Sequence, residues 1–255
     1  GNVGAQVVAR AAPDGYTALY TPNSTHAANI HLFRQLGFHP VRDFSPVTTT
    51  VSQAFILAVN PQVMPVKTLA ELTDYLKANP GKVNYASQGN GSVSHIGTEI
   101  FKQQTGTDMV HVPYRGCSPA LADAVSGQVP IFFNMISNSL PHAKNGKVRL
   151  LASASLQRLA SQPQLPTIAE SGFPAFDAYP WFGILAPAGT PREIVQMLSN
   201  ELAAAVQSAE IGDKLRGMNF EPTAATPESF ADIMRSDLVR WGRVVREAKV
   251  KAAPE

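Results

Sequence analysis

The chain has 255 residues, of which 44% are hydrophobic and 16% charged, and its formal net charge is +2. This length allows one large domain or two lobes, each with a buried core. Because the charge is near balance and no basic stripe is interleaved with aromatic residues, we expect no nucleic-acid partner. Cys117 is the single cysteine, so an intrachain disulfide is impossible and a Cys/His metal site has too few ligands. No apolar run reaches the ~20 residues of a membrane span.

Strand and helix signals alternate along the whole chain, which is typical of an α/β fold with largely parallel sheets. The chain begins in a segment of helical periodicity, from Val3 to Ala11, that stops at Pro13-Asp-Gly15. Apolar runs then predict six strands: Ala54–Val59, Val83–Ala86, Met109–Val112, Ile131–Phe133, Val148–Ala152 and Phe182–Ala186. Helix starts are predicted at Thr68-Leu-Ala-Glu71, Ser118-Pro119, Thr190-Pro-Arg-Glu193 and Thr226-Pro-Glu228.

Two of these strands suggest how the chain is divided. Ala54–Val59 and Phe182–Ala186 flank a complete strand–helix alternation, so the simplest arrangement makes them a pair of crossing strands between two lobes. Lobe 1 would then contain residues 1–55 and 180–255, and lobe 2 residues 56–179. The Pro- and Ser-rich segment 153–180 lacks periodicity, and we expect it to be a long irregular return.

The most informative segment runs from Tyr85 to His95, with the sequence Tyr-Ala-Ser-Gln-Gly-Asn-Gly-Ser-Val-Ser-His. A short strand leads into a loop of small and polar residues, and a helix opens at Ser92 to Ser94. Gly89 and Gly91 allow sharp turns that bring backbone N–H groups close to a guest. The free N–H groups and the positive dipole end of the helix favour an anion. With neither the lysine of a P-loop nor the third glycine of the dinucleotide fingerprint, the loop predicts a site for a small anion and no cofactor.

Ordered motifs along the chain support a family resemblance. They are Pro13-Asp-Gly-Tyr-Thr17, His111-Val-Pro-Tyr-Arg-Gly116, Ser118-Pro-Ala-Leu-Ala-Asp123, Gly127-Gln-Val129, Gly146-Lys-Val-Arg-Leu-Leu-Ala152, Leu165-Pro-Thr167 with Glu170-Ser-Gly172, and Ala186-Pro-Ala-Gly-Thr-Pro191. Together with the Tyr85–His95 segment they resemble the Bug/TctC family, the periplasmic solute-binding receptors of tripartite tricarboxylate transporters. The resemblance covers essentially the whole chain.

The resemblance implies a two-lobed type II periplasmic-binding-protein fold that closes on a small organic carboxylate, such as a di- or tricarboxylate, an acidic amino acid or an aromatic acid. It implies a periplasmic, monomeric, non-enzymatic protein whose partners are the membrane subunits of the transporter. The family opens with a strand, a Pro/Gly-rich loop and a helix that this sequence lacks. We therefore expect lobe 1 to be incomplete at its N-terminus.

The resemblance also assigns candidate ligand-binding residues. The loop matches the carboxylate-binding segment, which gives Ser87, Gly89, Asn90, Gly91, Ser92, Ser94 and His95. Tyr114 matches a cleft-lining position, although it could equally be core, and Asn134 stands where the family usually has Asp. Asn23 and Ser24 follow the lobe 1 strand that faces the cleft. Trp181 could be hinge packing or an aromatic wall for the ligand.

The residues also suggest two other functions. Ser92, His95 and Asp123 invite a serine-hydrolase interpretation, but no Gly-x-Ser-x-Gly elbow exists, and His95 at a helix N-terminus fits a hydrogen bond to the loop better than a role as a base. The same fold also serves as the effector domain of transcription regulators. That function would need an upstream helix-turn-helix domain, and the order of the family motifs argues against it.

Overall fold

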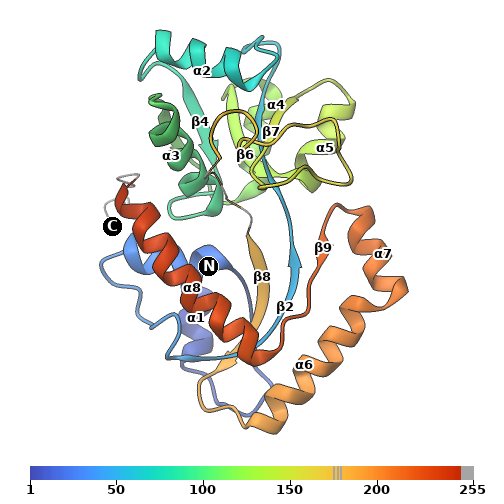
Figure 1. The fold of residues 1–255 in the computed structure, drawn as a ribbon. Coiled ribbons are helices and arrows are strands. Elements are labelled where there is room, and N and C mark those ends of the chain that lie inside the picture. Colours follow the sequence, from blue (N-terminus) through green and yellow to red (C-terminus); the bar gives the residue numbers. More distant parts are fainter. Residues whose placement is uncertain (175, 177, 179, 248–255) are drawn as a thin grey trace. The chain divides into compact units, whose positions relative to one another are not determined.

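The computed structural model describes residues 1–174, 176, 178 and 180–247, and the chain divides into two compact units. Unit 1 consists of Gly1–Ser52 and Pro180–Arg246, and unit 2 is built from Gln53–Tyr179. The chain therefore leaves unit 1 once and returns to it once. Figure 1 shows the elements of both units, and each unit is described by itself below.

Unit 1 contains a sheet of four strands in the order β1-β8-β2-β9. Its elements are α1 (Asn2–Ala9), β1 (Leu19–Pro22), a π-helical turn η1 (Ser24–Ala28), a 3-10 turn η2 (Asn29–His31), β2 (Phe44–Ser52), β8 (Trp181–Pro187), α6 (Arg192–Gln207), α7 (Ala209–Gly217), β9 (Glu221–Pro222) and α8 (Pro227–Glu247). All three strand pairings are antiparallel. The prediction of a largely parallel sheet is therefore wrong for this unit, because β8 returns to it between β1 and β2 in the opposite direction.

Strand β8 shows how helices cover the two faces of this sheet. On one face, Leu185 packs in a cluster with Phe230 and Met234 of α8 and Ala5 of α1. A Cβ atom on Gly183 would lie 2.4 Å from the Phe230 ring, so only glycine lets α8 approach this closely. On the other face, Ala186 packs against α6. This alternation is the period of two that a strand imposes on its side chains.

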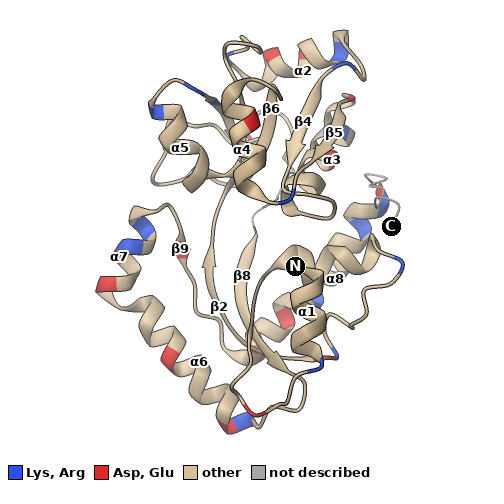
Figure 2. Ribbon diagram, turned by 180° about the vertical axis from the view of Figure 1, so that it is seen from behind, with Lys and Arg blue, Asp and Glu red and all other residues tan. Residues whose placement is uncertain are grey.

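The outer surfaces of these helices carry charges of both signs. Figure 2 shows acidic and basic residues along α6 and α7. Exposed pairs such as Lys214–Glu210 and Arg235–Asp232 lie three or four residues apart on one helix. Pairs of this kind contribute little stability but keep a helix face solvated.

Unit 2 is a five-stranded mixed sheet in the order β5-β4-β6-β3-β7. Its elements are β3 (Phe55–Val59), α2 (Leu69–Ala78), β4 (Asn84–Ser87), α3 (Val93–Thr105), β5 (Val110–Pro113), α4 (Cys117–Ser126), β6 (Ile131–Met135), α5 (Ile136–Lys144) and β7 (Arg149–Ser153). Strand β4 is parallel to β5 and β6, whereas β3 is antiparallel to β6 and β7. The six predicted strands are all present, shifted by at most two residues.

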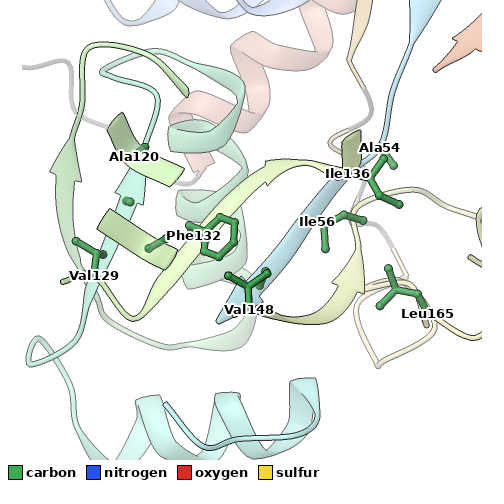
Figure 3. Packing of buried hydrophobic residues seen from close by; sticks show 11 residues of the cluster. Ala54, Ile56, Ala120, Val129, Phe132, Ile136, Val148 and Leu165 are labelled. Carbon is green, nitrogen blue, oxygen red and sulfur yellow. The ribbon is translucent and has the colours of Figure 1, made fainter. Parts of the chain in front are cut away.

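The core of unit 2 fills both faces of this sheet. Figure 3 shows one face, where Phe132 of β6 and Ile56 of β3 pack with Ala120 of α4 and Ile136 of α5. On the other face, the next residue of β6, Phe133, meets α3 where Gly97 leaves room for its ring. Helix α3 is thereby fixed against β4 and β6, and its N-terminus lies beside the loop that joins it to β4.

The predicted crossing pair needs a correction. Ala54–Val59 forms β3, which pairs with β6 and β7 inside unit 2, so it is not the partner of β8. The strand beside β8 is β2, and their register sets Ser52 opposite Trp181. The two connections to unit 2 therefore start from neighbouring positions at one end of the β2–β8 pair. The segment after β7 forms no helix or strand among its described residues, as expected for an irregular return.

Two of the four predicted helix starts are confirmed by their caps, whereas α4 begins at Cys117 with Gly116 as its N-cap, ahead of the predicted Ser118-Pro119. Thr68 Oγ1 accepts a hydrogen bond from the Glu71 N–H at 3.1 Å, and Thr226 Oγ1 accepts one from the Ser229 N–H at 3.2 Å. Thr190 does not cap α6: its hydroxyl donates to the carbonyl of Pro187, and the helix begins only at Arg192.

Candidate functional site

The candidate site is the loop between β4 and α3 in unit 2. Strand β4 ends at Ser87 and α3 begins at Val93, with Ser92 as its N-cap. The Ser92 Oγ accepts a hydrogen bond from the His95 N–H at 3.3 Å and donates one to the carbonyl of Gly89 at 2.6 Å. The predicted strand–loop–helix is therefore present, and its serine closes the loop on the first turn of the helix.

Two glycines give the loop its shape. Gly89 has φ of 120° and Gly91 has φ of 72°, both in the region that favours glycine. A Cβ atom on Gly89 would lie 3.0 Å from the carbonyl oxygen of Tyr114. The segment after β5 is held there because the Tyr114 N–H donates to the Ser87 carbonyl at 3.1 Å. The loop thus packs against neighbouring backbone at a distance that no other residue allows.

The loop's serine hydroxyls brace the loop itself. Ser94 Oγ accepts from the Gln88 N–H at 2.9 Å, and Ser87 Oγ accepts from the Gly89 N–H at 3.1 Å. The Ser92 and Ser94 oxygens lie 3.0 Å apart. The Ser92 hydroxyl already donates its proton to the Gly89 carbonyl. The Ser94 hydroxyl therefore donates its proton either to the Ser92 oxygen or to a bound ligand.

Three backbone amides of the loop and first turn have no acceptor in the described part of the chain: those of Asn90, Val93 and Ser94. The N–H groups of a first helical turn have no intrahelical partner, and the helix dipole adds partial positive charge there. The loop from Gln88 to Ser92 contains no Lys or Arg. The arrangement can therefore hold a small anion through neutral amide dipoles.

Two histidines lie behind the loop. His95 Nδ1 accepts from the Gly91 N–H at 3.2 Å, and His111 Nε2 lies 2.6 Å from Ser87 Oγ. Burial lowers the pKa of both rings to about 4, helped at His95 by the nearby Lys102 ammonium and at His111 by His95. Both imidazoles are therefore neutral near pH 7. His111, from strand β5, belongs to the same cluster.

Asn134 is joined to the loop through a residue that the sequence did not single out. Its Oδ1 accepts from Gln88 Nε2 at 2.9 Å and from the Met135 N–H at 2.8 Å. The Cys117 thiol lies 3.3 Å from the same oxygen and 3.1 Å from Asn138 Nδ2. Gln88 could have been noted because it follows the last strand residue, where a side chain reaches the carboxyl edge of the sheet.

The Tyr114 hydroxyl already donates a hydrogen bond within unit 2. The hydroxyl donates to Asp123 Oδ2 of α4 at 2.7 Å. Burial, together with that carboxylate, raises the pKa of Tyr114 to about 12. This phenol can accept a hydrogen bond from a ligand, but its proton is already used.

The remaining predicted site residues lie in unit 1. Asn23 and Ser24 are buried where β1 passes into η1, and among the residues that the structure describes neither the Oδ1 nor the Nδ2 of Asn23 has a hydrogen-bond partner. Trp181 lies in the core: its Nε1 donates to Asp237 Oδ2 at 2.8 Å, and its ring meets Phe230 edge-on at 4.9 Å. This placement favours the packing interpretation of Trp181 over an aromatic wall.

A surface pocket of about 320 Å³ lies elsewhere in unit 2, between α4 and α5, with Cys117, Asn138 and His142 in its wall.

Among the described residues no three His, Cys, Asp or Glu side chains come together as metal ligands. None of the described helices is long and apolar enough to cross a membrane.

Solved structures with the same fold define the class of protein. The chain superposes on the periplasmic binding protein BugD with a TM-score of 0.91 at 28% identity, over 99% of this chain and 84% of that one. R. palustris Rpa4515, solved with adipate, gives a TM-score of 0.94 at 34% identity and the same coverage. MatC from Rhodopseudomonas palustris, solved with malate, gives 0.89 at 32% identity over 96% of this chain and 84% of that one. The predicted class, an α/β periplasmic-binding-protein fold, is confirmed.

The family follows from the sequence. The tripartite tricarboxylate transporter family receptor, TctC, matches residues 1–250, and the chain belongs to this family. BugT of Bordetella pertussis is 32% identical over 252 residues, which cover 98% of this chain and 77% of BugT. A UPF0065 protein from Pseudomonas sp. strain P51 is also 32% identical, over 99% of this chain and 75% of that protein. The family is one of solute-binding receptors and not of enzymes, which rules out the hydrolase alternative.

Proposed function

We propose that this protein is a periplasmic receptor that binds a small organic carboxylate and delivers it to the membrane subunits of a tripartite tricarboxylate transporter. One carboxylate group of the ligand is held at the N-terminus of α3. The observation that carries the proposal is the set of unpaired amides of Asn90, Val93 and Ser94 at the positive end of that helix. Solved relatives with adipate and malate support the ligand class.

The chemistry of the loop also bears on specificity. Because the loop contributes amide and hydroxyl dipoles and no cationic side chain, its attraction for one carboxylate depends little on the rest of the ligand. We therefore expect several related acids to bind, such as C4–C6 dicarboxylates. Asn134, where the family usually has Asp, removes one negative charge beside the loop and widens the range of anions that the site accepts. Contacts of Asn23, Ser24 and Tyr114 with the ligand remain predictions.

A thermal-shift screen tests the proposal on the full chain. Its panel is C4–C6 dicarboxylates, citrate, nicotinate-like aromatic acids and acidic amino acids, with the diamide of each dicarboxylate as a matched uncharged control. A ligand at a hundredfold excess over its dissociation constant should stabilise the fold by about 2.7 kcal/mol. The proposal fails if no acid raises the melting temperature, or if acids and diamides act alike.

A further inference from the structure

Three aromatic rings from three elements of unit 2 are stacked behind the loop. The rings of His95 on α3 and His111 on β5 are 4.1 Å apart and inclined by 6°. Tyr85 of β4 covers the other face of His111, at 4.9 Å and 17°. Tyr85 and His111 are register partners in the parallel β4–β5 pair, so the sheet itself holds the stack in place.

Each histidine is linked to one glycine amide of the loop. His95 Nδ1 accepts directly from the Gly91 N–H, at 3.2 Å. His111 reaches Gly89 through Ser87, whose Oγ lies 2.6 Å from His111 Nε2 and accepts from the Gly89 N–H at 3.1 Å. Both glycine amides are thereby drawn toward the histidines. The amides that this leaves available are those of Asn90, Val93 and Ser94.

The stack requires uncharged imidazoles. The direct bond needs an unprotonated Nδ1 on His95, which places the ring proton on Nε2. Two parallel imidazolium rings at 4.1 Å would repel each other at close range. Other charged groups nearby compensate one another: Glu99 accepts from the Tyr85 hydroxyl at 2.6 Å and pairs with Lys102 at 3.0 Å, and Lys102 lies 3.5 Å from Asp108. Burial keeps the pKa of both histidines near 4.

We propose that His95 and His111 are positioning residues for the anion site: as a neutral stacked pair they fix the Gly89–Gly91 backbone so that the amides of Asn90, Val93 and Ser94 face the ligand. The histidines themselves do not touch the ligand. This inference rests on the proposed function and extends it: the two histidines determine which backbone amides face the ligand.

Matched substitutions at His95 test the role of its acceptor. In His95→Asn the side-chain oxygen can occupy the place of Nδ1 and accept from the Gly91 N–H, whereas His95→Leu removes the acceptor and keeps the bulk. With adipate as the probe in calorimetry at pH 7.5, His95→Leu should bind about ten- to hundredfold more weakly than wild type, since it leaves a buried donor unpaired. His95→Asn should stay within about threefold of wild type. Equal affinity of His95→Leu and wild type, or equal loss in both variants, would overturn the proposal.

A measurement on the ligand-free wild type keeps the inference testable if a variant misfolds or if adipate does not bind. Long-range ¹H–¹⁵N spectra report the tautomer of each histidine. His95 should carry its proton on Nε2 at pH 7, and the amide signals of Gly89 and Gly91 should shift together with ring protonation near pH 4. A proton on His95 Nδ1 at pH 7, or glycine amides that do not follow the rings, would contradict the positioning role. Failure of every acid in the thermal-shift panel to bind, with this NMR result intact, would instead count against the proposed function.

Discussion

Ser92 shows how one residue serves both the helix and the site. Its oxygen caps α3 by accepting from the His95 N–H, and its proton fixes the Gly89 carbonyl. The sequence was sufficient to predict Ser92 at the start of the helix, because it precedes an apolar stripe with helical spacing. It could not show that Gln88 bonds Asn134, 46 residues away, or that the serine hydroxyls turn back on their own loop. Those contacts depend on glycine backbone angles and on the sheet that brings β4 and β6 together.

Removing this cap should destabilise the protein as well as the site. Ser92→Ala should lower the free energy of unfolding by about 1 kcal/mol, the usual effect of losing an N-cap side chain. Ser92→Thr is the matched control, because threonine also caps helices and should stay close to wild type. Urea unfolding followed by circular dichroism measures both. A Ser92→Ala variant as stable as Ser92→Thr would show that the cap contributes nothing.

Among the elements, β2 is the most instructive omission from the sequence prediction. It reads Phe-Ser-Pro-Val-Thr-Thr-Thr-Val-Ser. Its β-branched residues suit a strand, but the threonines give no apolar run that would indicate burial, and the internal proline argues against a central strand. Strand β8 pairs along most of β2, β9 pairs with it only at Val51 and Ser52, and Val47 is buried against Val195 of α6. Register shifts between Pro46 and Thr48 interrupt the ladder where proline has no N–H to donate. The six predicted strands were visible because their own apolar residues make up the core.

The junction of β8 and α8 gives a prediction at the same scale. Asp237 of α8 is buried, accepts from the Trp181 indole and pairs with Arg240 at 3.1 Å. Asp237→Ala leaves that indole N–H unpaired and should cost about 1–3 kcal/mol of unfolding free energy. Asp232→Ala, which breaks the exposed pair with Arg235 on the same helix, should cost less than about 1 kcal/mol.

Chemical unfolding followed by tryptophan fluorescence compares the two variants under the same conditions. Equal stability of the two would mean that the Trp181–Asp237 bond does not anchor the first residue of β8.

At the scale of the whole molecule, the alternation of strand and helix signals was enough to predict the α/β class. The ordered motifs were enough to predict the family. The direction of strand pairing in unit 1 was not predictable, because it depends on a strand that returns after more than a hundred residues in unit 2. A strand of the same composition could have paired in either direction. The irregular segment that leads to β8 gives no local signal of which strands it will join.

Three histidines, the buried His26 and His95 and the partly buried His111, should make stability depend on pH. Burial lowers the pKa of each to about 4, below the value near 6.5 expected in an unfolded chain. The unfolded state then binds more protons between these values, so stability is fully present above pH 6.5 and is lost as the pH falls toward 4. Each additional proton steepens the loss by at most about 1.4 kcal/mol per pH unit.

Urea unfolding at constant ionic strength between pH 4.5 and 7.5 measures this slope. Below about pH 5.5 the carboxyls of Asp43 and Glu170, whose pKa values are lowered by backbone N–H donors from His39 and Thr167, also contribute, so the histidine slope is taken between pH 5.5 and 7.5. His95→Asn cannot titrate at this position and should flatten the curve. A free energy of unfolding that is constant across the range would refute the assignment of neutral buried histidines.

The central claim is that the amides at the N-terminus of α3 hold a carboxylate, and an NMR titration of the ¹⁵N-labelled full chain with adipate tests it most directly. We expect the largest amide shifts at Asn90, Val93 and Ser94, with little change when the uncharged diamide is added. Saturable shifts confined to another place, such as the α4–α5 pocket around Cys117 and Asn138, with the loop amides unchanged, would contradict it.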